Sequence, residues 1–391
     1  MPGSDGILKS GYSMSLALST LTPPLAARSV SAAKSGAGRI PMIDAARFLA
    51  SIAVVWLHTP RSALVASYSL SNVGYFAVPF FTMMAMFFCV KGVRNSPDRP
   101  FAEYARLRFT RLYVPFAVWV ALYVLLRLAL RHWFIYEDVP LDWRLLIVGT
   151  NGHPWFLPFV LVACLLAFGF TRLVLARPRL ELPIIVIASV LAVAVALTPE
   201  RFWQNLAFLV PPDYQDKLGH RLIILSVRLP AFFIGLAFAL GFHRIPRRVW
   251  QKSAVGVAGL LITVGAMTAM CHAPHAVWRH VGGFGWLLMA MMPWQGAIVR
   301  LLSRLGNLTL GIYITHMALI EIVRGCNRTL YDGGTLATDL AVFAFAAIGS
   351  IILTKLLSRS RWTHWMLPIT SPVSARPSAY FPADTSAHRA A

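Results

Sequence analysis

Charged residues are scarce in this sequence. Asp, Glu, Lys and Arg make up only 13% of its 391 residues, whereas 57% are hydrophobic. A soluble domain carries about 25% charged residues, so the shortage argues against a soluble enzyme. The apolar excess argues against a disordered or fibrous chain. We predict an all-α fold, a polytopic bundle of transmembrane helices.

Acidic residues are scarcer still. Asp plus Glu total 15 against 36 Lys plus Arg, which gives a net charge of +21. A basic balance can indicate nucleic-acid binding. Here, however, the basic residues lie in short stretches between apolar runs, as in the cytoplasmic loops of helical membrane proteins. We therefore expect membrane lipid, and no nucleic acid, among the partners.

Cysteine is rare and shows no metal-binding pattern. Its four copies form neither CxxC nor a zinc spacing, so we expect no metal site. Each lies in or beside an apolar run, which is typical of small packing residues. A disulfide between Cys271 and Cys326 at the outer face is the alternative.

Long apolar runs are abundant, and they predict about ten membrane spans. The loops between them alternate between rich and poor in Lys and Arg, which places both termini in the cytoplasm. We expect a transmembrane domain over 39–365, between disordered cytoplasmic tails at 1–38 and 366–391. The predicted spans are 43–62, 73–93, 112–130, 154–175, 182–198, 221–242, 254–271, 282–302, 308–324 and 336–357.

Two ionisable residues share one face of the first predicted span. Arg47 and His58 are eleven residues apart. On an α-helix they lie about 20° apart around the axis and about 16 Å apart along it. Arg47 alone could snorkel to lipid phosphate, and His58 alone could bond to a neighbouring helix. Together they indicate a polar stripe that faces the bundle interior. Ionisable residues in such a position usually have a functional role.

Other polar residues lie within the later spans. His316 follows Tyr313 by three residues, on the same helical face. A neutral imidazole can take a proton from a hydroxyl near pH 7. Arg228 lies within the sixth span, and we expect it to form a structural ion pair with Glu321.

Two further groups mark the ends of spans. Arg106, Arg108 and Arg111 lie at the cytoplasmic mouth of the third span, where they set topology or bind an anionic ligand. Arg108 and Arg111 would lie side by side if that segment is already helical. His153 and Trp155 begin the fourth span, where tryptophan serves as an interfacial anchor or as a pocket wall.

These residues resemble the motifs of a known family. Arg47-x10-His58, Arg108-x-x-Arg111, His153-x-Trp155-Phe-Leu and Gly311-x-Tyr313-x-x-His316 occur in that order. The pattern is similar to the acyltransferase-3 family of integral membrane O-acyltransferases, over roughly residues 39–360. The chain resembles the single-domain type, which lacks the additional hydrolase-like domain of some members.

The resemblance implies a bacterial inner-membrane enzyme. It would move an acyl group, usually acetyl from acetyl-CoA, to a hydroxyl of an exported carbohydrate such as exopolysaccharide or O-antigen, including lipid-linked acceptors. The motif residues then divide into three roles by position. Those expected to be catalytic are His58, Arg47 and His316; those for the coenzyme A donor are Arg108 and Arg111; those for the acceptor are Tyr313, Trp155 and His153.

A different class of protein also uses charged groups inside the membrane. A proton-coupled transporter or flippase of a glycan or lipid-linked precursor would need Arg and His within its spans. It also predicts broken helices at matching positions in two halves. Pro230 and Pro293 form no convincing pair of this kind. The sequence therefore favours the acyltransferase, with its sugar, its acyl group and its oligomeric state undetermined.

Overall fold

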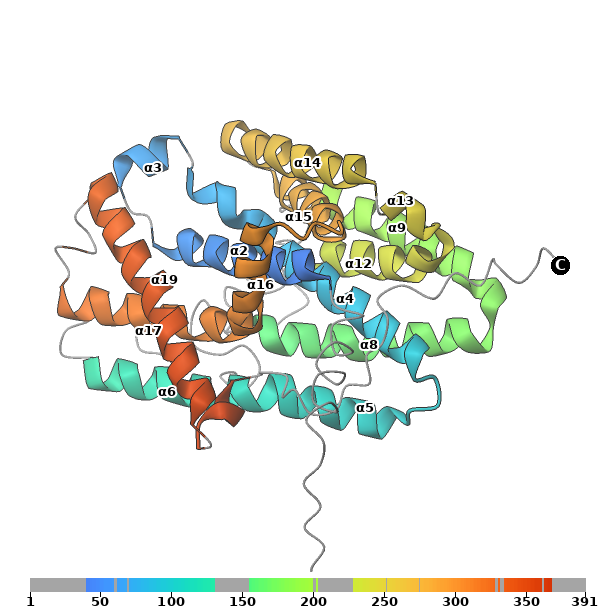
Figure 1. The fold of residues 1–391 in the computed structure, drawn as a ribbon, viewed down its shortest axis with the longest axis horizontal. Coiled ribbons are helices and arrows are strands. Elements are labelled where there is room, and N and C mark those ends of the chain that lie inside the picture. Colours follow the sequence, from blue (N-terminus) through green and yellow to red (C-terminus); the bar gives the residue numbers. More distant parts are fainter. Residues whose placement is uncertain are drawn as a thin grey trace, which may run out of the picture. The chain divides into compact units, whose positions relative to one another are not determined.

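The chain is helical wherever its structure is defined. The computed structural model describes residues 40–59, 62–68, 70–130, 155–199, 202, 228–250, 252–273, 275–327, 330, 334–360 and 362–367. All regular secondary structure in these ranges is helical, which confirms the predicted all-α class (Figure 1). The predicted N-terminal tail and residues 368–391 lie outside the described residues.

Twelve α-helices of eight residues or more make up most of the described chain, and shorter helical turns join several of them. Among the described residues, eight helical segments are long and apolar enough to cross a bilayer, and Leu229–Arg244 is a shorter apolar one. A polytopic helical bundle is therefore confirmed, while the count of ten spans stays a prediction. The helices are α2 (Pro41–His58), α4 (Ala77–Asn95), α5 (Phe101–Arg108), α6 (Val114–Leu130), α8 (Phe156–Ala176), α9 (Glu181–Leu197), α12 (Leu229–Gly241), α14 (Ser253–His272), α15 (Ala276–Ala290), α16 (Ala297–Leu305), α17 (Thr309–Cys326) and α19 (Leu336–Arg359).

The predicted eighth span is wrong in its boundaries. We expected one helix over 282–302, but α15 ends at Ala290 and α16 begins at Ala297. The intervening segment contains Pro293, which lacks the amide hydrogen that an α-helix needs. The residues between the two helices are themselves largely apolar, so the averaged hydropathy did not show the break. α16 instead leads through a 3-10 turn, Gly306–Leu308, into α17.

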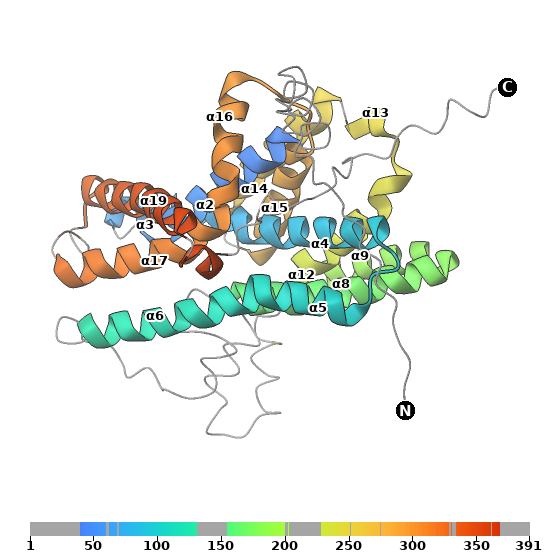
Figure 2. The same ribbon diagram turned by 60° about the horizontal axis from the view of Figure 1, so that its bottom comes forward.

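Helix α2 lies at the centre of the packing. It contacts α4, α15, α16, α17 and α19 (Figures 1 and 2). Small residues allow some helices to approach closely, as in other membrane bundles. At the crossing of α14 and α15, a Cβ added to Gly259 would lie 2.5 Å from the carbonyl oxygen of Gly285. The described cysteines form no disulfide, so the alternative Cys271–Cys326 bridge is absent.

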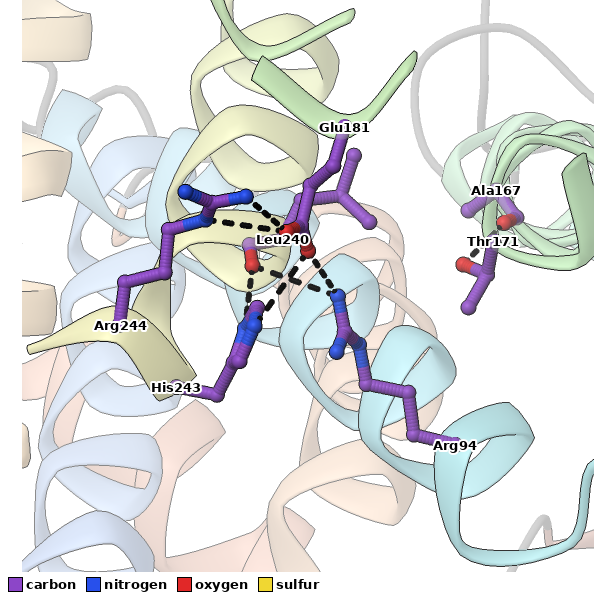
Figure 3. Close-up of polar contacts among 7 residues, drawn as sticks. All are labelled: Arg94, Ala167, Thr171, Glu181, Leu240, His243 and Arg244. Atoms are coloured by element: carbon purple, nitrogen blue, oxygen red, sulfur yellow. Dashed lines mark hydrogen bonds and ion pairs between the residues drawn. The ribbon is translucent and has the colours of Figure 1, made fainter. Parts of the chain in front are cut away.

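A buried carboxylate joins three helices at one end of the bundle. Glu181, at the start of α9, forms ion pairs with Arg94 of α4 and with Arg244 just after α12 (Figure 3). His243 lies 3.5 Å from the same carboxylate. The Glu181 side chain is only 7% exposed, so its charge depends on these partners. The cluster fixes α9 against α4 and α12.

Loss of this carboxylate is expected to destabilise the bundle. Glu181→Gln leaves two arginines near each other without their acid, which costs about 1–3 kcal/mol of unfolding free energy. Glu103→Gln is the matched control, because its pair with Arg99 is exposed and worth well under about 1 kcal/mol. Thermal unfolding of the purified variants in detergent measures both. Equal melting temperatures for the two variants would contradict a structural role for Glu181.

Candidate functional site

The first predicted pair lies on α2. Arg47 and His58 are both partly buried. The Arg47 guanidinium lies 3.3 Å from the carboxylate of Asp44, one turn earlier on the same helix, and Asp44 is buried. The indole of Trp286 donates to the carbonyl of Ala46 at 3.1 Å, which fixes α2 against α15. α2 is thus packed against α15 beside Arg47, while the interior position of the polar stripe stays a prediction.

The two predicted histidines meet. The rings of His58 and His316 have centroids 5.5 Å apart and are inclined by 38°. His316 is completely buried in α17, and its Nδ1 lies 2.9 Å from the carbonyl oxygen of Ile312. Because a carbonyl only accepts hydrogen bonds, this contact places the imidazole proton on Nδ1 and the lone pair on Nε2. Nε2 therefore has the basic lone pair that proton-transfer chemistry requires.

An aromatic wall extends from His316. The Tyr313 ring lies 6.2 Å from that of His316 and 5.5 Å from Phe156, the first residue of α8. Trp155 precedes Phe156, with ring centroids 6.0 Å apart. On the other side, the Tyr123 hydroxyl of α6 donates to the carbonyl of Ile314. The structure thus brings His58, His316, Tyr313 and Trp155 into one continuous set of contacts.

Arg228 contacts this aromatic wall, and the sequence did not predict that contact. Its guanidinium lies over the Trp155 ring, 4.4 Å from the centroid. The expected ion pair with Glu321 is wrong, because among the described residues Arg228 makes a cation–π contact and pairs with no carboxylate. The signal for Arg228 was present in the sequence as a cation inside an apolar run. Its neighbour could not be chosen without the tertiary structure.

The arginines of the third span form a separate group. The helix begins at Phe101, well before the predicted 112, and continues through a π-helical turn, Phe109–Tyr113. Arg108 is partly buried over the ring of Tyr104, 5.1 Å from its centroid, whereas Arg111 is exposed. The segment is helical as expected, but the two side chains have different surroundings. Arg108 lies about 22 Å along this helix from Tyr123, which contacts α17.

His153, metal binding and an apolar cavity lie outside the contacts described above. His153 lies outside the described residues. Within the described ranges, no three His, Cys, Asp or Glu side chains gather in a way that could hold a metal ion, and the expected absence of a metal stays a prediction. An apolar cavity of about 720 Å³ lies between α9, α12, α14 and α15, away from the histidine pair.

Comparison with known protein families gives a match over most of the chain. The model of the acyltransferase-3 family, described as an acyltransferase domain, matches residues 40–359. No curated protein and no solved structure gives a significant match to the chain. The matched range includes the histidine pair, its aromatic wall and the arginines of the third span.

Proposed function

We propose a function from the premise that this chain belongs to the acyltransferase-3 family of membrane acyltransferases. Our proposal is that it moves an acetyl group from cytoplasmic acetyl-CoA to a hydroxyl of an exported or cell-surface carbohydrate, in the inner membrane of a bacterium. The observation that carries it is the contact of His58 with His316, 5.5 Å between ring centroids, inside a bundle of apolar helices.

The histidine pair supplies the base that acyl transfer requires. In the proposed reaction His58 takes the proton of the acceptor hydroxyl while that oxygen attacks the thioester carbon. The carbon–sulfur bond breaks, and the proton passes from His58 to the departing thiolate of coenzyme A. His316, with its proton directed to the Ile312 carbonyl, orients His58 or the sugar through Nε2. A route through acyl-His58 uses the same residues.

The arginines suit the charged end of the donor. Arg108 and Arg111 are proposed to hold the phosphates of acetyl-CoA at the cytoplasmic face, since guanidinium groups bind phosphate bidentately. Arg47 lies on α2 between that face and His58, where it can orient the thioester or stabilise charge developing on its carbonyl oxygen. Tyr313 and Trp155 are proposed to line the acceptor side of the histidines.

Substitution of these arginines is expected to weaken donor binding. Arg108→Gln and Arg111→Gln should each raise the KM for acetyl-CoA by about 10-fold or more, the loss of one charged hydrogen bond, with a smaller change in kcat. Arg106→Gln is the matched control, because Arg106 is exposed on the same helix and lies outside the motif. Steady-state kinetics in detergent measure the effect. An unchanged donor KM in both variants removes these residues from the donor site.

The direct test of the function is made in cells. Deletion of the gene should remove O-acetyl signals from the surface glycan, measured by NMR, and the wild-type gene should restore them. Unchanged acetylation on deletion would contradict the proposal. Loss of the whole polymer, without an acetyl-specific change, would favour the flippase instead.

A further inference from the structure

A half-buried cation beside the aromatic wall has no acidic partner among the described residues. Arg228 immediately precedes α12, and its Nε is buried without a hydrogen-bond acceptor. Its guanidinium lies over the face of Trp155, 4.4 Å from the ring centroid. Removing a charge from water costs several kcal/mol unless a counter-charge is nearby. A guanidinium in this position is therefore suited to a ligand that brings the negative charge itself.

The surroundings of Arg228 add positive rather than negative potential. Arg279 of α15 contributes a second positive charge that acts on Arg228. Its own guanidinium lies over the ring of Tyr75, 4.3 Å from the centroid. The first amides of α12 add the positive end of a helix dipole. Two arginines, each held over an aromatic ring, thus form a positively charged group that suits an anionic ligand.

The position of this group relates it to the acceptor. Trp155 and Tyr313 connect Arg228 to His316 through the aromatic wall, whereas Arg108 contacts the ring of Tyr104 on α5. We infer that Arg228, with Arg279, binds an acidic group, a carboxylate or a phosphate, on the carbohydrate that receives the acyl group. This inference rests on the proposed function, and it assigns acidic glycans as the substrate class.

The test compares acceptors that differ only in charge. Full-length protein in lipid nanodiscs is given acetyl-CoA and a glucuronic-acid-containing oligosaccharide, or the same oligosaccharide with each carboxylate reduced to a primary alcohol. We expect wild type to prefer the acidic acceptor in kcat/KM by about 10- to 100-fold, the effect of one or two charged hydrogen bonds. Glucose 1-phosphate, added as a competitor, distinguishes a phosphate site from a carboxylate site.

Variants assign the preference to Arg228. Arg228→Gln should abolish it through a raised acceptor KM and leave the KM for acetyl-CoA unchanged, while Arg228→Lys should retain part of it. Arg172→Gln removes an exposed arginine elsewhere and should keep the full preference. A higher KM for acetyl-CoA in Arg228→Gln would assign the anion to the donor and overturn the inference. A lower kcat with both KM values unchanged would assign Arg228 to transition-state charge and overturn it as well.

Binding separates this inference from the proposed function. Equilibrium binding of the fluorescently labelled oligosaccharide to the protein in nanodiscs reports ligand without any turnover. If wild type binds the glucuronic-acid-containing oligosaccharide, Arg228→Gln does not, and no acyl transfer occurs, the proposed function fails and the anion site stands. If wild type binds or acetylates the acidic and reduced forms equally, the anion site is refuted whatever the activity.

Discussion

His58→Asn is expected to lower acyl transfer by about 10²–10⁴-fold, the contribution of a positioned general base. Asparagine keeps much of the size and hydrogen-bonding capacity of the side chain, but it cannot take a proton from a hydroxyl. The loss should appear in kcat with little change in either KM, because proton removal stabilises the transition state and not the bound substrates. The measurement is acetyl transfer from labelled acetyl-CoA by purified protein.

The control for His58 is a histidine on another helix. His272→Asn changes an exposed residue at the end of α14 and should retain wild-type activity. His58→Ala provides a second variant, and its melting temperature reports whether any loss reflects misfolding. A folded His58→Asn protein with wild-type kcat would exclude His58 as the base and remove the central observation from the proposed mechanism.

His316→Ala is expected to lower kcat by about 100-fold, the lower end of the range for groups that take part in proton transfer. Its ring lies beside that of His58, and its lone pair is fixed on Nε2 by the contact with Ile312. Residues that act as one unit show strongly non-additive effects. The double variant His58→Ala, His316→Ala should therefore be about as slow as the slower single variant.

Two comparisons test whether His316 acts chemically. Thr315→Ala alters the neighbouring buried residue, whose hydroxyl donates to the Gly311 carbonyl of its own helix, and should keep most of the activity. Loss of activity in that variant would indicate that any disturbance of α17 is harmful. Full activity in His316→Ala would confine His316 to packing. Single effects that multiply in the double variant would show that the two histidines act independently.

Sequence patterns predicted individual helices better than the breaks between them. Hydropathy located α2 within a few residues, because a lone apolar run bounded by polar residues has one helical solution. It missed the early start at Phe101, since a polar, arginine-rich helix is stabilised by packing against α8 and not by its own composition. It also merged α15 with α16 across Pro293, where apolar residues continue although the helix does not.

The candidate site divides in the same way. The alignment of Arg47 with His58 follows from helical geometry alone, as does the pairing of Tyr313 with His316 on α17. The meeting of His58 with His316 could not be derived from spacing, because 258 residues separate them and many helix arrangements bury both. For Arg228, the sequence predicted the wrong partner. Its charge predicted an ion pair with Glu321, whereas in the folded chain Arg228 contacts the ring of Trp155.

The sequence by itself determined that this chain is a polytopic helical membrane protein. It also determined which polar residues lie in apolar runs, and it carried the motifs of the acyltransferase-3 family. These are local properties, set by hydropathy and by the periodicity of a single helix. The tertiary structure decided which side chains meet: the histidine pair, its aromatic wall and the cation beside Trp155. Those contacts join α2, α8, α12 and α17, and their geometry depends on how four helices pack and not on any one of them.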